Sequence, residues 1–309
     1  MFNKPRFWRE KNSLIALILL PFSFLVILIV LIKRLLTRSI NFNIPIICVG
    51  NIYIGGTGKT PSSILIANEL KKLGRNPAIV CKFYRSHQDE YQLIKKYFQN
   101  LIIEKDRTLA INGAEKGKFD SVILDDGFQD YKIKKNLNII CFNQNQLVGN
   151  GLVIPAGPLR ESLNSLKEVD LILINGGKNL DFEKKILEIN SNLEIFYCDY
   201  KIVNIDKFKN NKVLALAGIG NPDNFFKILV ENGIEIKKKI SFPDHYDFKK
   251  DEIDKIIQEA DHLNLKIIVP EKNFMKLKYF NTQKIHFLKV ELEIKNKEKF
   301  FKRILKIYD

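Results

Sequence analysis

A glycine-rich loop between a buried strand and a helix constrains the fold of this chain more than any other feature. Residues 46–61 read IICVGNIYIGGTGKTP: an apolar strand, Ile46–Val49, precedes the loop, and Lys-Thr opens a helix over Thr60–Leu73. Glycines let backbone N–H groups close around phosphate oxygens, and the helix directs its positive end at the same anion. The segment predicts a phosphate-binding loop made of Gly55, Gly56, Thr57, Gly58, Lys59 and Thr60.

Two side chains of this loop carry its chemistry. Lys59 can reach the β- and γ-phosphates of a nucleotide, and the Thr60 hydroxyl can ligate Mg²⁺. The match to the G-x-x-x-x-G-K-T pattern is incomplete, because Tyr53 stands where that pattern has its first glycine. Strand, loop, Lys-Thr and helix nevertheless follow in the required order, which favours nucleotide binding over a chance cluster of glycines.

A second strand ends in two carboxylates. Residues 122–129 read VILDDGFQ, the apolar run ending in aspartate that accompanies a phosphate-binding loop and places a carboxylate beside its Mg²⁺. Asp125 and Asp126 point in different directions, so one is expected in the metal shell while the other orients the metal or the loop. The alternative is an ordinary Asp-Gly turn at the end of a strand.

A loop rich in proline and glycine follows. Residues 149–161 read GNGLVIPAGPLRE, which excludes a regular strand or helix and delivers Arg160 and Glu161 at a helix start. The planar guanidinium of Arg160 suits phosphate contact. A rigid surface turn with a solvated ion pair explains the same composition.

The N-terminus predicts a membrane helix. Leu14–Ile32 contains no charged residue and is near the length that crosses a bilayer core. Basic residues flank it on both sides, and Phe7 and Trp8 stand where interfacial aromatic residues are expected. A cleaved signal peptide or a buried soluble helix is less consistent with this pattern. Pro21 and Ser23 leave open whether the helix spans the bilayer or enters one leaflet.

Charge and cysteine usage narrow the class of protein. The net charge of +15 indicates anionic partners, although part of it reflects a general use of lysine. No nucleic-acid-binding motif occurs, so acidic lipid headgroups beside a membrane helix are the favoured partner, and no protein partner is indicated. The cysteines fall singly in apolar runs and predict buried, reduced thiols in a cytosolic domain: Cys48, Cys81, Cys141 and Cys198.

The alternation of strands and helices predicts an α/β fold with a mostly parallel sheet covered by helices on both faces. Strands are expected at Ile46–Val49, Ala78–Cys81, Ser121–Leu124, Leu137–Phe142 and Leu171–Ile174. A second group begins with the strand Val213–Ala217 and includes helices Asn224–Asn232 and Lys250–Leu263 and strands Ile267–Val269 and His286–Ile294. The predicted parts are a membrane helix (1–38), a P-loop core domain (39–205) and a smaller α/β domain (206–309).

Several motifs together resemble the tetraacyldisaccharide 4'-kinase family. They are KPRFW, GNIYIGGTGKTP, LDDGFQD, GNGLVIPAGPLRES, LALAGIGNPDNFF and FPDHYDF, in that order over essentially the whole chain. The resemblance implies ATP- and Mg²⁺-dependent phosphorylation of the 4'-hydroxyl of an acylated glucosamine disaccharide 1-phosphate in lipid A biosynthesis. It also implies attachment to the inner membrane with the active site on the cytosolic face.

The resemblance further implies roles for individual residues. Lys59 and Thr60 would bind phosphate and Mg²⁺, and Asp125 and Asp126 would serve the metal. Asp89 would be the catalytic base, with His245 as its partner. The residues that would line the substrate site are Arg107, Gln129, Arg160 and Glu161.

The chain departs from the family pattern in two places. The family's S-R-G-Y-G after the second strand is replaced here, and only a short segment separates Arg85 from Asp89. The family's Lys-Asp in the second domain appears as Lys272-Asn273. Both changes concern the lid over the substrate and leave phosphate binding untouched.

Other functional classes fit less well. A partitioning ATPase would have a lysine where this chain has Ile54, and the N-K-x-D base reader of a GTPase is absent from the sequence. A membrane-associated NTP-binding scaffold, or an ATPase without lipid kinase activity, remains the alternative.

Overall fold

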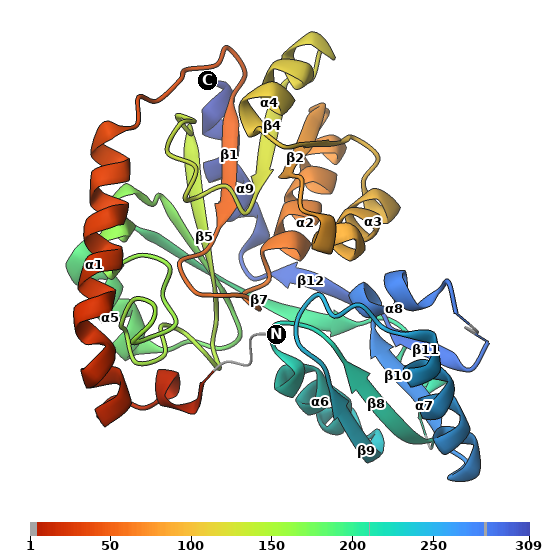
Figure 1. Ribbon diagram of the computed structural model, residues 1–309. Helices are drawn as coiled ribbons and strands as arrows, with labels where there is room; N and C mark the ends of the chain where they lie inside the picture. Colours follow the sequence, from red (N-terminus) through yellow and green to blue (C-terminus); the bar gives the residue numbers. More distant parts are fainter. Residues whose placement is uncertain (1–4, 210, 281–282) are drawn as a thin grey trace. The chain divides into compact units, whose positions relative to one another are not determined.

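The computed structural model describes residues 5–209, 211–280 and 283–309, which fall into two compact units (Figure 1). The larger, here called the core unit, contains residues 5–83, 100–199 and 292–309. The other, here called the small unit, contains residues 84–99 and the described part of 200–291.

The core unit is built on an eight-stranded sheet with the order β12-β7-β6-β5-β1-β4-β2-β3. The pairings from β3 through to β7 are parallel. Every residue of β1 and β4 is buried, which requires cover on both faces of the sheet. The strands are β1 (Ile46–Gly50), β2 (Pro77–Lys82), β3 (Leu101–Glu104), β4 (Ser121–Asp125), β5 (Leu137–Asn143), β6 (Leu171–Asn175), β7 (Glu194–Ile202) and β12 (Val290–Ile294).

Helices that follow strands of the sheet supply this cover. They are α2 (Lys59–Lys72), α4 (Arg107–Lys116), α5 (Leu180–Ile189) and α9 (Lys297–Leu305). The α4 side chains Ala110, Ile111 and Ala114 pack with strand residues such as Val122 and Leu124. Farther along the sheet, Phe182 and Ile186 of α5 pack with a separate apolar cluster. The predicted covered parallel sheet is confirmed.

The sheet order places the glycine loop and the aspartates side by side. β1 lies between β4 and β5. After β1 the chain continues to β2 and β3 on one side of it, and after β4 it continues to β5 and β6 on the other side. Val49 pairs with Asp125, so the end of β4 is level with the end of β1, where the loop begins. Ligands bind beyond the carboxyl ends of parallel strands at such a switch point.

The small unit has its own four-stranded parallel sheet, with the order β11-β10-β8-β9. Its strands are β8 (Lys212–Ala217), β9 (Glu235–Ser241), β10 (Lys266–Pro270) and β11 (Ile285–Leu288), and its helices are α3 (Gln88–Tyr97), α6 (Pro222–Glu231), α7 (Lys250–His262) and α8 (Glu271–Leu277). Leu214 and Leu216 of β8 pack with α7, whereas Val213 and Ala215 pack with α6. This alternation follows the two-residue period of a strand covered on both faces.

The boundaries of the two units differ from the predicted domain boundary at 205/206, because two segments belong to the other unit. Helix α3 belongs to the small unit, where the Tyr97 hydroxyl donates to both carboxylate oxygens of Glu271 at 2.7 and 2.8 Å. Residues 292–309 return to the core unit. The single strand expected over His286–Ile294 is wrong, because the chain breaks at Lys289 into β11 and β12, which join different sheets.

Helix α1 (Leu14–Leu36) is drawn in red in Figure 1. It is long and apolar enough to cross a membrane, and only 11% of its most apolar window is buried. Ala16 and Ser23 are buried one heptad apart, and Val26 and Ile27 pack against the cluster that includes α5. One stripe of the helix therefore contacts protein, and the rest is exposed.

Two local expectations have opposite outcomes. Trp8 is not at an exposed interface: it is 2% exposed, and its indole N–H donates to the Pro155 carbonyl at 3.0 Å, so that expectation is wrong. The four cysteines are buried thiols that form no disulfide, as expected. Burial raises the pKa of Cys48 to about 11 and that of Cys141 to about 12, which keeps both protonated.

Candidate functional site

The glycine loop of the core unit has the backbone of an anion cradle. Gly55, Gly56 and Gly58 have φ angles of 68, 70 and 90°, a left-handed region in which other residues are strained. Gly58 caps α2, so the free N–H groups at the helix start open onto the loop. Thr57 is buried and its hydroxyl accepts from the Asn51 amide at 2.9 Å, which fixes the loop from inside.

Asp125 joins the loop to the sheet through two hydroxyl groups. Thr60 Oγ1 donates to Asp125 Oδ2 at 2.9 Å, and Ser63 Oγ donates to Asp125 Oδ1 at 3.0 Å. Asp125 is 6% exposed. The carboxylate is therefore oriented on both oxygens and lies directly beside the Thr60 hydroxyl.

Asp126 faces cations instead. Its Oδ1 lies 3.7 Å from Lys59 Nζ, and Arg160 Nη1 donates to its two carboxylate oxygens at 2.9 and 3.1 Å. Burial acts to raise the pKa of Asp126, but the charges of Lys59 and Arg160 outweigh it and lower the pKa below its usual value. The backbone of Asp126 has a φ of 56°, a strained conformation that aims its side chain away from that of Asp125.

Arg107 and Gln129 support this turn from behind. Arg107 is 7% exposed, and its Nη2 donates to the carbonyls of Asp125 and Asp126 at 3.2 and 2.8 Å. Gln129 Nε2 donates to the Asn51 carbonyl at 2.9 Å, and its Oε1 accepts from Arg160 at 3.3 Å. Both residues therefore hold protein groups of the site in place.

The loop 149–161 is tied to the glycine loop through its backbone. Ile54 N donates to the Pro158 carbonyl at 3.0 Å, and Arg160 N donates to the Ile52 carbonyl at 2.7 Å. Tyr53, which replaces the first glycine of the usual pattern, is buried and forms an isolated bridge with Leu159. The unusual residue at position 53 thus serves to dock the neighbouring loop.

The donor set at this end of the sheet fits a nucleotide with Mg²⁺. Mg²⁺ takes oxygen ligands, commonly one or two carboxylates together with phosphate oxygens. The Thr60 hydroxyl and the Asp125 carboxylate supply such oxygens, and Lys59 and Arg160 supply positive charge. Glu161, also predicted at this site, is 3% exposed, and its Oε1 has no hydrogen-bond partner in the described structure.

The other predicted residues lie in the small unit. Asp89 lies in the first turn of α3 and is completely buried, and its Oδ1 lies 3.3 Å from His245 Nδ1. The same oxygen accepts from Glu90 N at 3.0 Å, whereas Oδ2 has no hydrogen-bond partner in the described structure. His245 has a φ of 60°, so the loop that presents it is strained.

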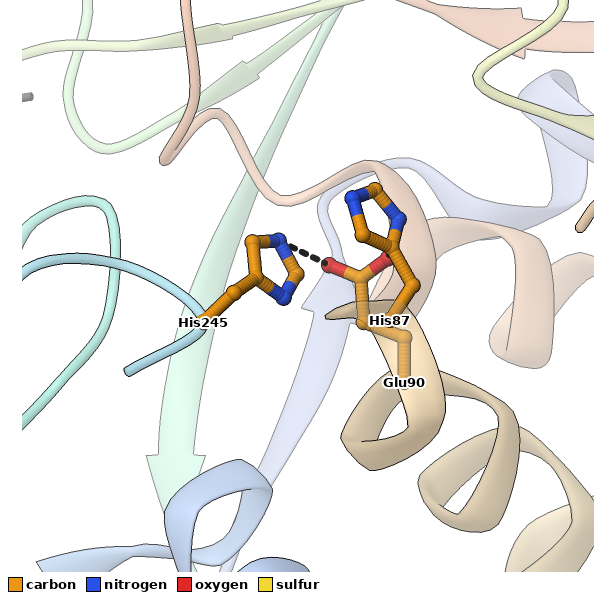
Figure 2. A group of neighbouring side chains, drawn as sticks. All are labelled: His87, Glu90 and His245. Carbon is orange, nitrogen blue, oxygen red and sulfur yellow. Dashed lines mark ion pairs between the residues drawn. The ribbon is translucent and has the colours of Figure 1, made fainter. Parts of the chain in front are cut away.

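A second histidine stacks on this pair. His87 and His245 have ring centroids 4.0 Å apart and planes within 3° of parallel. Figure 2 shows both rings beside Glu90, whose Oε1 is 3.6 Å from His245 Nε2 and whose Oε2 is 3.3 Å from His87 Nδ1. These three residues are near enough to share a cation. Parallel rings cannot both direct in-plane lone pairs at one ion, so this arrangement does not fit a metal.

Lys272 supplies the positive charge in this cluster. Its Nζ lies 2.8 Å from Glu90 Oε1 and 3.0 Å from Asp244 Oδ1. Burial acts to lower the pKa of Lys272, but Glu90 and Asp244 outweigh it and raise the pKa. Burial acts to raise the pKa of Glu90 and Asp244, and Lys272 leads the charges that hold both below their usual values.

The departure at Asn273 has a structural explanation. Asn273 is 1% exposed, its Oδ1 accepts from Gly218 N at 2.8 Å, and its Nδ2 donates to the Gly218 carbonyl at 2.8 Å. An ionised aspartate would offer only the acceptor half of this exchange. Asn273 therefore joins the start of α8 to the end of β8.

Sequence reasoning missed several residues of both clusters. Ser63 lies three residues after Thr60, so helical spacing alone places both hydroxyls on one face of α2. The stacking of His87 gave no such signal, because its partner His245 comes from a distant segment. Lys272 was noted only as part of the family pattern, without its partners Glu90 and Asp244.

Comparisons with known proteins agree over nearly the whole chain. The family model described as tetraacyldisaccharide-1-P 4'-kinase matches residues 15–309. The tetraacyldisaccharide 4'-kinase of Pelagibacter ubique is 39% identical over 98% of both chains, and that of Haemophilus influenzae is 31% identical over 95% of this chain and 93% of its own. The crystal structure of LpxK from Aquifex aeolicus in complex with ATP is similar with a TM-score of 0.73 and 25% identity, covering 96% of this chain and 100% of its own. The chain belongs to the tetraacyldisaccharide-1-P 4'-kinase family.

Proposed function

We propose that this protein transfers the γ-phosphate of ATP to the 4'-hydroxyl of a tetraacyldisaccharide 1-phosphate, giving the 4'-phosphorylated lipid and ADP. The observation that carries the proposal is the contact of Lys59 and Thr60 with the paired carboxylates Asp126 and Asp125, in a chain that matches the kinase family over 15–309. A nucleotide-binding loop alone would be compatible with many functions.

The core unit is proposed to hold the phosphate donor. Phosphoryl transfer depends mainly on positioning and on neutralising charge. The backbone N–H groups of the glycine loop and Lys59 bind the β- and γ-phosphates, and Thr60 and Asp125 hold the metal. Mg²⁺ bound there with ATP would neutralise charge on the transferring phosphoryl group. Arg160, held by Asp126, offers a second cation to the phosphates.

The small unit is proposed to supply the base. Oδ1 of Asp89 is oriented by His245 and by the backbone N–H of Glu90, whereas Oδ2 carries lone pairs without a partner in the described structure. Asp89 Oδ2 would accept the proton of the 4'-hydroxyl as the new P–O bond forms. His245 would keep the carboxylate in the orientation that this proton transfer needs.

Three residues expected to bind substrate are proposed to act differently. Arg107 and Gln129 position the Asp125–Asp126 turn and Arg160, because Arg107 Nη2 and both amide atoms of Gln129 bond to protein atoms. Glu161 keeps a buried oxygen without a partner in the described residues and remains a candidate for contact with the sugar.

We propose that α1 holds the protein on the inner membrane with the active site in the cytosol. Ala16, Ser23 and Ile27 occupy one stripe that packs on the core unit, which favours a helix lying in one leaflet over one that crosses the bilayer alone. The acyl chains of the substrate remain in lipid, since exposing them costs about 0.8 kcal/mol per CH₂.

The test is transfer of label from γ-labelled ATP to the acylated disaccharide 1-phosphate in mixed micelles. We expect a labelled lipid that appears with ADP and requires Mg²⁺. ADP formation without labelled lipid would indicate an ATPase, and nucleotide binding without turnover would indicate a scaffold.

A further inference from the structure

Ser23 is a polar side chain in the middle of an apolar helix, and it faces protein. It is 2% exposed, whereas its neighbours Phe22 and Phe24 are 58% and 66% exposed. Its Oγ donates to the Val153 carbonyl at 2.7 Å and accepts from Ala156 N at 3.0 Å. The hydroxyl therefore bonds to two backbone groups of the loop 149–161.

A second contact from the N-terminal segment holds the same loop. Trp8 Nε1 donates to the Pro155 carbonyl at 3.0 Å, and Asn150 N donates to the Trp8 carbonyl at 2.7 Å. A Cβ on Gly149 would lie 2.6 Å from the Trp8 carbonyl oxygen, so the two backbones are in close contact. Trp8 and Ser23 thus form hydrogen bonds to the loop 149–161 at two separate places.

The opposite side of the loop reaches the phosphate site. Pro158 accepts from Ile54 N, and Arg160 N donates to Ile52, both within the glycine-loop segment. The Arg160 side chain then bonds Asp126. A continuous set of hydrogen bonds therefore runs from the apolar helix through the loop to the cations of the phosphate site.

We propose that Ser23 is a positioning residue that docks α1 onto the loop 149–161 and thereby fixes Arg160 for phosphoryl transfer. The apolar helix is then part of the phosphate site as well as a membrane attachment. The consequence for turnover rests on the proposed role of Arg160, whereas the docking itself does not. Replacing Ser23 by alanine leaves Ala156 N without this partner and leaves the Val153 carbonyl with the bond from Gly157 N. The change weakens the dock without removing apolar surface.

Hydrogen exchange of the full-length protein in detergent micelles tests the docking alone. Ser23→Ala should speed exchange of the Ile54 and Arg160 amides by about tenfold, since one to two hydrogen bonds are lost. Thr37→Val is the matched control, because Thr37 Oγ1 bonds only the Lys33 carbonyl of its own helix. Ser23→Thr, which keeps the hydroxyl, should restore protection. Unchanged exchange in Ser23→Ala would overturn the proposal.

Steady-state kinetics test whether the docking by Ser23 affects turnover through Arg160. Below the unfolding temperature, Ser23→Ala should lower kcat about tenfold while vesicle co-sedimentation stays within twofold of wild type. In an Arg160→Ala background the same change should have little further effect, because groups that act as one unit are non-additive. An equal loss in both backgrounds would overturn the route through Arg160. If Arg160→Ala itself kept full turnover, its assigned role would fail, and the exchange experiment would still decide the docking.

Discussion

The phosphate site of the core unit comes from short continuous segments, whereas Asp89 and His245 of the small unit are 156 positions apart. The phosphate site relies on backbone N–H groups and a few cations around Asp126. The small-unit cluster gathers three carboxylates around Lys272. A site that binds an anion needs donors and positive charge, and a site that takes a proton needs a carboxylate oxygen positioned to accept it.

The comparison also separates two kinds of support. Asp125 is oriented by hydroxyls from the helix that follows its own phosphate loop. Asp89 depends on a histidine from a strained loop, and its neighbour Glu90 pairs with Lys272 of α8. We therefore expect the core site to tolerate changes in the small unit, and the small-unit cluster to fail when a single distant partner is removed.

The largest effect is expected at the phosphate site. Lys59→Ala and Asp125→Ala should each lower kcat by about a thousandfold, since each removes charge or orientation from the transferring phosphoryl group. Steady-state kinetics with saturating Mg²⁺ and ATP measure this, with circular dichroism to check folding. Lys72→Ala, on the exposed end of α2, is the matched control and should retain activity. Near-native turnover by Asp125→Ala would move the metal assignment to Asp126.

The next effect is expected at the acid–histidine pair. Asp89→Asn should lower kcat by about a hundredfold while ATP affinity, measured by calorimetry, changes little. A hundredfold loss in kcat is at the lower end of the range for general-base catalysis. We expect this value because the transition state of phosphoryl transfer is loose and needs little proton removal.

The double variant Asp89→Asn/His245→Ala sharpens this result. It should be hardly worse than Asp89→Asn alone, because the two groups act as a unit. Asp247→Asn is the control, since Asp247 is exposed and pairs with Lys276. Multiplicative losses would show that Asp89 and His245 act separately, and His245 would then be a loop residue of the small unit only.

We expect the protein to bind the membrane through α1 of the core unit alone. Replacing Leu17, Leu25 and Leu28, on the exposed side of α1, with serine should weaken binding to anionic vesicles by about thirtyfold, from the apolar area lost. Co-sedimentation measures the partitioning. Leu109→Ser and Leu263→Ser remove equally exposed leucines elsewhere and should bind as wild type. An equal loss in these controls would mean that lipid contacts are spread over the surface.

The smallest effect is expected on stability, through Lys272. Lys272→Met should lower the free energy of unfolding by about 1–3 kcal/mol at pH 7, because Glu90 and Asp244 lose their counter-charge while both remain partly exposed.

The pH dependence of this loss follows from the pKa directions. The pKa values of Glu90 and Asp244 are lowered on folding, so their contribution is present above the ordinary values of 4.5 and 3.8 and is lost as pH falls below them. The pKa of Lys272 is raised on folding, so its contribution to stability is fully present below its ordinary pKa of 10.5. Denaturant titrations should show the full difference between about pH 5 and 10 and a smaller one at pH 3. A difference that does not depend on pH would mean that Lys272 stabilises through packing.

Sequence patterns predicted the strands that are buried along their whole length and missed the partly buried strands β3, β7 and β9. The apolar runs of β1 and β4 are unmistakable because both faces are covered. Strand β9 reads EIKKKIS and alternates exposed and half-buried residues, so it carries no apolar run to detect. The break at Lys289 was invisible because β11 and β12 form one continuous β-type sequence.

By itself, the sequence indicated the glycine loop, the apolar helix and the kinase family, because each is encoded in short segments whose pattern is local. The conformation of a glycine loop depends on local φ angles, and the length of an apolar run depends only on its neighbours in the chain. Tertiary structure decided that α3 belongs to the small unit, that His87 stacks on His245 and that Ser23 docks on the loop 149–161. These contacts join segments far apart in the chain, and their partners are chosen by packing, which no local pattern records.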